Sequence, residues 1–287
     1  MDGWTMVVDV QFCRVGPEFC VGLGSVLFLY AFSSPNFLCF MLSSTVARCA
    51  RSMSTSTSAA AKAKVSQLLR KATAVCFDVD STVCVNEGLD DLADFCGAGE
   101  AVAALTNQAM GGSVPFEVAL KQRLDLFSPS KDDVDRFLAA HPPTLTPGVH
   151  EFMNALRARG TAVYLISGGF VPLIEPAAKE LGIPTEDIYA NKIIHGDNGE
   201  YVGFDETAFT SRSGGKPRAV TDVMNRHGGG EGKIFLMVGD GATDCEAKPP
   251  ADAVLGFGGI VEREVVKSKA DWFIYDFQDA IKALEDE

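Results

Sequence analysis

The chain has 287 residues, of which 47% are hydrophobic and 22% charged. This composition is that of a globular protein with one large domain, or a core with a smaller domain attached, and it excludes a disordered chain. The 38 Asp and Glu residues outnumber the 25 Lys and Arg residues, so the formal net charge is −13. Nucleic acids and anionic membrane surfaces both attract basic proteins, and neither is expected as a partner.

Residues 1–70 have the composition of a presequence. No Asp or Glu occurs between Glu18 and Asp78. The apolar run Val21–Phe32 has the length of the hydrophobic part of a signal peptide. The sequence after Met41 is rich in Ser, Thr, Ala and Arg, which is typical of an organellar transit peptide. We therefore predict that residues 1–70 direct the protein to an organelle, a plastid first of all, and are removed there.

Other interpretations of the same segment stay open. A transit peptide could begin at Met41, if the start codon has been assigned too far upstream. The destination could be the mitochondrion, or the cytosol if the presequence is a start-site artefact. The uncharged stretch Phe19–Ala47 could form a signal anchor, although Pro35 weakens that interpretation. For the mature enzyme we expect no stable membrane association.

After residue 72, short apolar segments alternate with amphipathic ones. The sequence predicts strands at Ala74–Phe77, Ala162–Ile166, Ile234–Val238, Ala253–Leu255 and Trp272–Ile274. It predicts helices at Val149–Arg159, Leu173–Leu181, Lys216–Asn225, Val261–Ser268 and Phe277–Glu285. Apolar strands separated by helices predict an α/β fold with a doubly wound parallel sheet.

Two segments interrupt this alternation. Residues 89–141 carry apolar residues three and four apart with no strand pattern, which predicts a helical cap inserted after the first strand. The catalytic core would then comprise residues 73–88 and 142–287. Within the core, Asp197-Asn198-Gly199 lies between two apolar runs of Asn191–Phe204 and predicts a β-hairpin.

Four polar clusters follow predicted strands or begin a helix. They are DVDST (78–82), SGG (167–169), SGGK (213–216) and GDGATD (239–244). A parallel sheet would bring these clusters to one edge. Together they offer a carboxylate nucleophile, a second acid, a cation, a hydroxyl and further carboxylates for Mg²⁺, which is a complete set for phosphoryl transfer.

The four motifs, in this order and spacing, resemble those of the haloacid dehalogenase-like phosphatases. The resemblance is closer to the phosphoserine phosphatase family, because NEGLDDLADFCG (86–97), AMGGSVPFEVALKQRL (109–124) and GEYVGFDET (199–207) are also similar. It extends from Thr73 to the C-terminus and does not include the first seventy residues.

This resemblance implies a mechanism. Asp78 would form an aspartyl-phosphate, and Asp80 would protonate the leaving oxygen and then activate water. Mg²⁺ would be held by Asp78, the backbone carbonyl of Asp80, and Asp240, with Asp244 in support. The phosphoryl oxygens would be bound by Ser167, Gly168, Gly169 and Lys216.

The resemblance also implies a substrate, O-phospho-L-serine. Glu87 would bind its ammonium group and Arg123 its carboxylate, with Met110, Gly111 and Thr243 as further contacts. The reaction would be the last step of serine biosynthesis. The oligomeric state stays open, a homodimer included.

Four alternatives remain. Phosphatases for other small metabolites share the nucleophile and metal motifs, and only the pair Glu87 and Arg123 separates them here. A phosphotransferase would use the same residues, whereas an ion-pumping ATPase is disfavoured by the acid at position 80. A catalytically inactive scaffold would require the loss of a core residue, and each of the core motif residues is present.

Overall fold

The computed structural model describes residues 59–110, 114–229 and 232–285, with the backbone alone for residues 107–110. The expected targeting segments before residue 59, and Gly111, lie outside the described residues. Within these ranges, none of the helices combines the length and the apolar character that a bilayer crossing requires.

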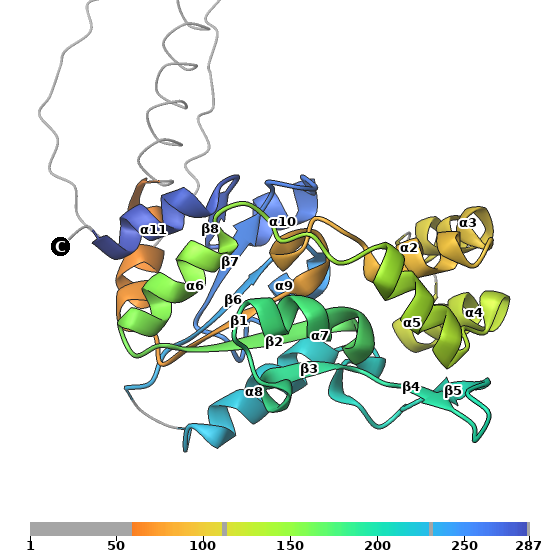
Figure 1. Cartoon of the computed structure of the whole chain (residues 1–287). Helices are drawn as coiled ribbons and strands as arrows, with labels where there is room; N and C mark the ends of the chain where they lie inside the picture. The colour runs from red at the N-terminus through yellow and green to blue at the C-terminus, as the bar shows by residue number, and fades with distance from the viewer. Residues whose placement is uncertain (1–58, 111–113, 230–231, 286–287) are drawn as a thin grey trace, which may run out of the picture. The chain divides into compact units, whose positions relative to one another are not determined.

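A six-stranded parallel sheet forms the centre of the core (Figure 1). Its order is β3-β2-β1-β6-β7-β8, so β1 lies in the middle and the chain winds outward from it in both directions. The strands are β1 (Ala74–Phe77), β2 (Ala162–Phe170), β3 (Ile188–Asn191), β6 (Phe235–Gly239), β7 (Ala253–Phe257) and β8 (Trp272–Ile274).

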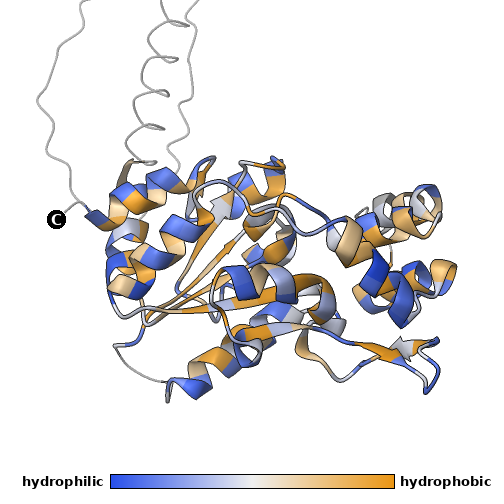
Figure 2. Cartoon of the chain, viewed as in Figure 1, coloured by the Kyte–Doolittle hydropathy of each residue, from blue (hydrophilic) through white to orange (hydrophobic). Residues whose placement is uncertain are grey.

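The two faces of the sheet bury different residues. On β1, Val75 and Phe77 belong to one hydrophobic cluster, and Ala74 and Cys76 to another, because successive side chains of a strand point to opposite faces. Helices α6 (Val149–Ala158), α7 (Val171–Glu180) and α11 (Phe277–Glu285) contribute to the first cluster, and α8 (Gly215–Arg226) to the second. Figure 2 shows the apolar strands between these amphipathic helices. The predicted doubly wound α/β fold is confirmed.

Shorter helical elements complete the core. These are η1 (Val79–Val83), η2 (Thr185–Asp187), η3 (Phe209–Ser211), α9 (Ala242–Glu246) and α10 (Glu264–Lys269). The predicted hairpin forms from β4 (Ile193–His195) and β5 (Tyr201–Phe204), with Gly199 at a φ of 82° in its turn. Strand β3, directly before the hairpin, was not predicted.

Four helices form the cap: α2 (Gly88–Phe95), α3 (Gly99–Met110), α4 (Phe116–Phe127) and α5 (Lys131–Ala140). Helices α2, α4 and α5 share a hydrophobic cluster that includes Leu92, Leu120 and Leu124, and that extends to Phe170 of β2 and Phe204 of the hairpin. The cap therefore has an apolar interior that continues onto the core beside the end of β2.

Residues 59–70 form a helix that the sequence analysis assigned to the presequence. Val65 and Leu69 of this helix are fully buried in the first core cluster, and the Arg70 side chain donates a hydrogen bond to the carbonyl of Ala283 on α11. This packing conflicts with a presequence that extends to residue 70. The folded domain begins before Thr73, because the helix covers apolar surface that would otherwise contact water.

We expect Leu69→Ala to lower the free energy of unfolding by about 3 kcal/mol, because it removes a fully buried side chain and leaves a cavity. The measurement is urea denaturation of the full chain. Gln67→Ala on the same helix is the control, since Gln67 is exposed. Equal stability of the two variants would show that the helix is not part of the folded domain.

Candidate active site

Asp78 and Asp80 lie in an irregular turn at the carboxyl end of the central strand. Asp78 directly follows β1, and its side chain accepts a 2.8 Å hydrogen bond from the backbone N–H of Val79. Within the turn Ser81 has a φ of 55°, which reverses the chain. Asp80 accepts hydrogen bonds from the backbone N–H of Gly88 at 2.8 Å and from the Ser167 hydroxyl at 3.4 Å.

The environment of Asp80 favours a protonated carboxyl group. Burial raises its pKa to about 7, and the negative charges of Asp78 and Glu87 act in the same direction. The hydrogen bond from Gly88 and the charge of Lys216 oppose this shift. Asp80 can therefore exchange a proton near neutral pH, as a general acid and base requires.

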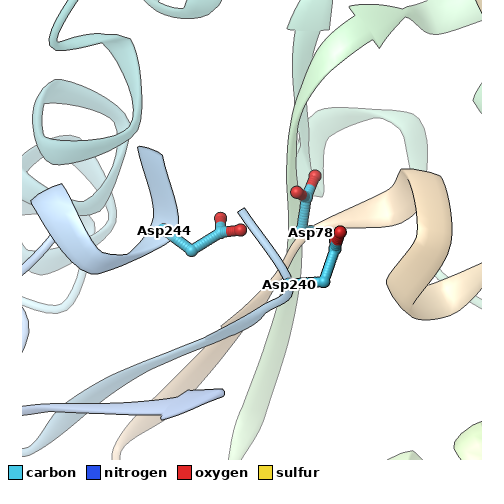
Figure 3. A group of neighbouring side chains, drawn as sticks. All are labelled: Asp78, Asp240 and Asp244. Atoms are coloured by element: carbon cyan, nitrogen blue, oxygen red, sulfur yellow. The ribbon is translucent and has the colours of Figure 1, made fainter. Parts of the chain in front are cut away.

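Three carboxylates converge at this edge of the sheet. Asp240 follows β6, Asp244 lies on α9, and one ligand oxygen from each of these and from Asp78 lies within 4.8 Å of the others. All three residues are at most 9% exposed. Figure 3 shows Asp244 directed toward Asp78 and Asp240. The adjacency of β1 and β6 brings these residues together across more than 160 positions of sequence.

Lys216, in the first turn of α8, is the buried cation of the site. Its Nζ lies 2.5 Å from Oδ2 of Asp78 and 2.6 Å from Oδ1 of Asp244. Burial alone would lower the pKa of Lys216, but the charges of Asp244 and Asp78 more than offset this effect and hold the pKa above its ordinary value. Lys216 is therefore charged, and its two ion pairs connect the DVDST motif to the GDGATD motif.

Asp240 has its own partners. It accepts hydrogen bonds from the Thr82 hydroxyl at 2.9 Å and from Nε of Arg263 at 3.0 Å. The Arg263 guanidinium also lies 3.6 Å from the carboxylate of Glu87. Arg263 was not predicted to contribute, because a lone arginine within the predicted helix Val261–Ser268 carries no motif.

The carboxylates of this cluster retain an excess of negative charge. Burial, and then the nearby charge of Asp78, raise the pKa of both Asp240 and Asp244. Among the described residues, Lys216 and Arg263 are the cations paired with these three acids. Oxygen ligands of this kind fit a hard divalent cation such as Mg²⁺, which would relieve the remaining repulsion.

The SGG motif forms the last residues of β2, which extends to Phe170 and not only to the predicted Ile166, and it lies beside Asp80 where the pairing with β3 shifts register. Ser167 is fully buried, and its hydroxyl accepts a 2.8 Å hydrogen bond from the backbone N–H of Gly169. The amide of Asn191 donates to the carbonyl of Gly168 at 2.7 Å and anchors the motif. Asn191 was not predicted to contribute, because its role depends on the pairing of β3 with β2.

The cap closes over this motif. A Cβ on Gly168 would lie only 3.1 Å from Cζ of Phe116, so the ring at the start of α4 covers the glycine. The neighbouring Glu117 accepts hydrogen bonds from the backbone N–H and the hydroxyl of Ser213, each at 3.1 Å. Ser213 begins the SGGK motif, so α4 contacts both phosphate-binding motifs that the sequence predicts.

The two residues expected to recognise substrate lie at the junction of cap and core. Glu87 accepts a 2.7 Å hydrogen bond from the Ser81 hydroxyl of η1. Burial lowers the pKa of Arg123 on α4, and the charges of Asp90, Glu87 and Asp80 raise it. Arg123 is therefore close enough to Glu87 and Asp80 to interact with their charges. Thr243 is exposed on α9, and the side chain of Met110 lies outside the described residues, as does Gly111.

The comparisons with known proteins agree with this geometry. Residues 72–249 match the haloacid dehalogenase-like hydrolase family. The chain belongs to the haloacid dehalogenase-like hydrolases. It is 52% identical over 224 residues to the chloroplastic phosphoserine phosphatase of Arabidopsis thaliana, a match that covers 77% of this chain and 75% of the relative. It is 48% identical over 220 residues to phosphoserine phosphatase of Homo sapiens, covering 77% and 96%.

Solved structures of other proteins share the fold. A substrate-bound phosphoserine phosphatase complex has a TM-score of 0.63 at 26% identity and covers 74% of this chain and 97% of its own. The DsGPDH structure of Dunaliella salina has a TM-score of 0.68 at 36% identity, covering 77% of this chain and 37% of that longer chain.

We expect Gly239→Ala to lower the free energy of unfolding by about 1–3 kcal/mol, because the new Cβ would overlap the buried carboxyl group of Asp244, whose atoms lie 2.2 Å away. That carboxylate cannot move freely, since Lys216 and the Gly241 N–H hold it. Gly203→Ala is the control, because a Cβ there meets no atom within 4 Å. Denaturant unfolding of both variants tests the prediction, and equal stabilities would contradict it.

Proposed function

We propose that this hydrolase converts O-phospho-L-serine and water to L-serine and phosphate through an aspartyl-phosphate on Asp78. The observation that carries the proposal is the position of the buried Asp78 carboxylate, 2.5 Å from Lys216 and two residues from the protonatable Asp80. The relatives from Arabidopsis thaliana, Bos taurus and Homo sapiens, all named phosphoserine phosphatase, support the choice of substrate.

In the first step an oxygen of Asp78 attacks phosphorus. A new bond forms between this oxygen and phosphorus while the ester bond to serine breaks. Asp80 gives its proton to the departing serine oxygen, which its pKa of about 7 allows. The products of this step are serine and phosphorylated Asp78.

In the second step water attacks the same phosphorus atom. Asp80, now a carboxylate, takes a proton from the water, and the bond between phosphorus and Asp78 breaks. Phosphate leaves, and both aspartates return to their starting states. One residue thus serves as acid and then as base, because it faces the same oxygen position in both steps.

The phosphoryl oxygens would be bound by Ser167, Lys216 and the amides of Gly168 and Gly169. The buried Ser167 hydroxyl already lies between Asp80 and the Gly169 N–H, at 3.4 Å and 2.8 Å. Lys216 would balance the charge that develops on these oxygens. Donors held in advance by the fold need no rearrangement during the reaction.

Asp78, Asp240 and the backbone carbonyl of Asp80 would hold Mg²⁺, with Asp244 in support. When bound, the metal supplies positive charge that lets a carboxylate approach an anionic phosphate. The three clustered carboxylates fit this role, since burial and mutual repulsion raise the pKa of two of them.

Recognition of the serine part would divide between Glu87, for the ammonium group, and Arg123, for the carboxylate. Arginine can grip a carboxylate with two parallel hydrogen bonds, so it fixes orientation as well as charge. Met110, Gly111 and Thr243 would make further contacts. Because Arg123 lies in the cap, substrate binding would favour the closed arrangement and exclude water.

This activity would complete serine biosynthesis in an organelle. The acid-free segment before Asp78 and the chloroplastic relative of Arabidopsis thaliana both support a plastid and a removable presequence. The packing of residues 59–70 on the core supports processing before this helix. The homodimer considered from the sequence stays a prediction.

We expect the full chain with Mg²⁺ to hydrolyse L-phosphoserine at least tenfold more efficiently than phosphothreonine, phosphoglycolate, glycerol phosphate or a nucleoside monophosphate. The physical reason is that only amino-acid esters engage both Glu87 and Arg123, and the extra methyl group of phosphothreonine must also fit. Phosphate release, measured as kcat/KM, tests this specificity.

Two controls accompany the assay. Removal of Mg²⁺ and Asp78→Asn should each abolish turnover of all substrates. Equal turnover of substrates without an amino-acid group would remove the substrate assignment and leave a general phosphatase. No turnover of any of these esters would favour a non-catalytic role.

We also expect the single-turnover rate of serine release to fall about tenfold per pH unit above pH 7. Only protonated Asp80 can donate to the serine oxygen, and its pKa, raised by burial to about 7, sets where the protonated fraction begins to decline. A rapid-quench measurement from pH 7 to 9 follows this decline. p-Nitrophenyl phosphate, whose leaving group needs no proton, should show a much weaker decline, and identical slopes for both esters would refute the assignment of Asp80.

A further inference from the structure

Asp90, Thr106 and Arg123 form a polar cluster inside the cap. They lie on three different helices, α2, α3 and α4, which group together in Figure 1. Nη1 of Arg123 lies 3.7 Å from Oδ1 of Asp90, and the two side chains are 15% and 33% exposed. This separation makes an ion pair without a full hydrogen bond.

The hydrogen bonding of the cluster is incomplete among the described residues. Oδ1 of Asp90, Oγ1 of Thr106 and Nε of Arg123 are all shielded from solvent, and none has a hydrogen-bond partner there. Buried polar atoms without partners are rare and costly in folded proteins. The Nε–H of Arg123 is the donor among them, and a buried donor without a partner indicates a site that is completed by a bound acceptor.

The unpartnered Nε identifies the chemistry of that group. An arginine binds a carboxylate in a bidentate manner through two N–H groups of one edge, and the Nε edge is such an edge. Since Asp90 is paired with Nη1, the Nε atom stays available for a second carboxylate. A ligand carboxylate would therefore meet an arginine whose orientation Asp90 already restricts.

The charges around Arg123 are consistent with this arrangement. Burial raises the pKa of Asp90, as does the charge of Asp91, whereas the charge of Arg123 and the nearby Thr106 hydroxyl lower it. The Thr106 hydroxyl lies close to the Asp90 carboxylate without meeting the geometry of a hydrogen bond. For Arg123, burial lowers the pKa and Asp90 is the largest opposing influence. Without Asp90, a long flexible side chain in a partly buried position would lose the acid whose charge acts on it most strongly.

We propose that Asp90 and Thr106 are specificity-determining positioning residues, which hold Arg123 ready to receive the carboxylate of the substrate. Neither residue touches the reacting atoms. Their contribution is to reduce the rotamer freedom that the arginine loses on binding, which would otherwise weaken affinity. This inference rests on the proposed function, because it assumes that Arg123 binds a substrate carboxylate.

Helix α2 provides a matched control. Asp91 is adjacent to Asp90 and is also half-buried, but it accepts a hydrogen bond from the Asn86 amide at 3.3 Å instead of pairing with Arg123. Asp91→Ala removes the same charge from the same helix. A difference between the two variants therefore isolates the contact with Arg123.

The experiment compares L-phosphoserine with phosphoethanolamine, which lacks the carboxylate, in the full chain with Mg²⁺. We expect Asp90→Ala to raise the KM for L-phosphoserine about tenfold, with kcat changed less than twofold and both constants for phosphoethanolamine unchanged. Asp91→Ala should leave the KM values of both substrates within twofold of the original chain. Thr106→Val should raise the KM for L-phosphoserine by a smaller factor.

Several results would overturn the inference. One is an equal loss on both substrates, which would indicate a structural role of Asp90 in the cap. Another is an unchanged KM for L-phosphoserine in Asp90→Ala. If that variant fails to fold, as thermal unfolding would reveal, Asp90→Asn preserves the shape of the side chain and serves in its place under the same expectations.

A double variant tests the coupling directly. In Arg123→Ala, the further change Asp90→Ala should alter the KM for L-phosphoserine less than twofold, because its partner is already absent. A tenfold increase there would show that Asp90 acts independently of Arg123. If the original chain does not prefer L-phosphoserine to phosphoethanolamine, the proposed function itself is wrong. If the original chain does prefer L-phosphoserine, but Asp90→Ala and Asp91→Ala have the same KM for it, only the role of Asp90 is wrong.

Discussion

The site depends on one buried cation held between two aspartates. Lys216 lies 2.5 Å from Asp78 and 2.6 Å from Asp244, and the three side chains come from β1, α8 and α9. Carboxylates so close together repel one another in a buried site, and the positive charge of the lysine offsets that repulsion. The same contact holds the Asp78 oxygen beside the cation, in the position from which the proposed attack on phosphorus would start.

The proposed catalytic groups and the proposed recognition groups lie largely in different parts of the structure. The groups for phosphoryl transfer would come from the ends of β1, β2 and β6 and from the adjoining helices α8 and α9. Of the proposed recognition residues, Arg123 lies on cap helix α4 and Glu87 directly precedes α2, whereas Thr243 lies on α9 of the core. Helix α4 contacts Gly168 and Ser213, so a change in the position of the cap would alter access to the proposed phosphate-binding motifs.

Several elements followed from local sequence patterns alone. The predicted limits of β1, β8 and α11 agree with the structure, because each is a short apolar or amphipathic segment between clear polar boundaries. Strand β3 was missed, since four residues of mixed character do not distinguish a strand from a loop. The helix at residues 59–70 was assigned to the presequence because its Ala, Lys and Ser content is shared by transit peptides, and only its packing of Leu69 reveals its role.

The sequence by itself determined the order of the motifs along the chain, the chemical groups available and the family, since these depend on residue types and their spacing. The tertiary structure decided which groups meet. Arg263 reaches Asp240, Asn191 anchors Gly168 and Asp90 pairs with Arg123 only because strands and helices that are distant in sequence lie side by side. Contacts of this kind have no signature in one sequence, because a polar residue pairs according to the three-dimensional position of its neighbours and not according to the residues beside it.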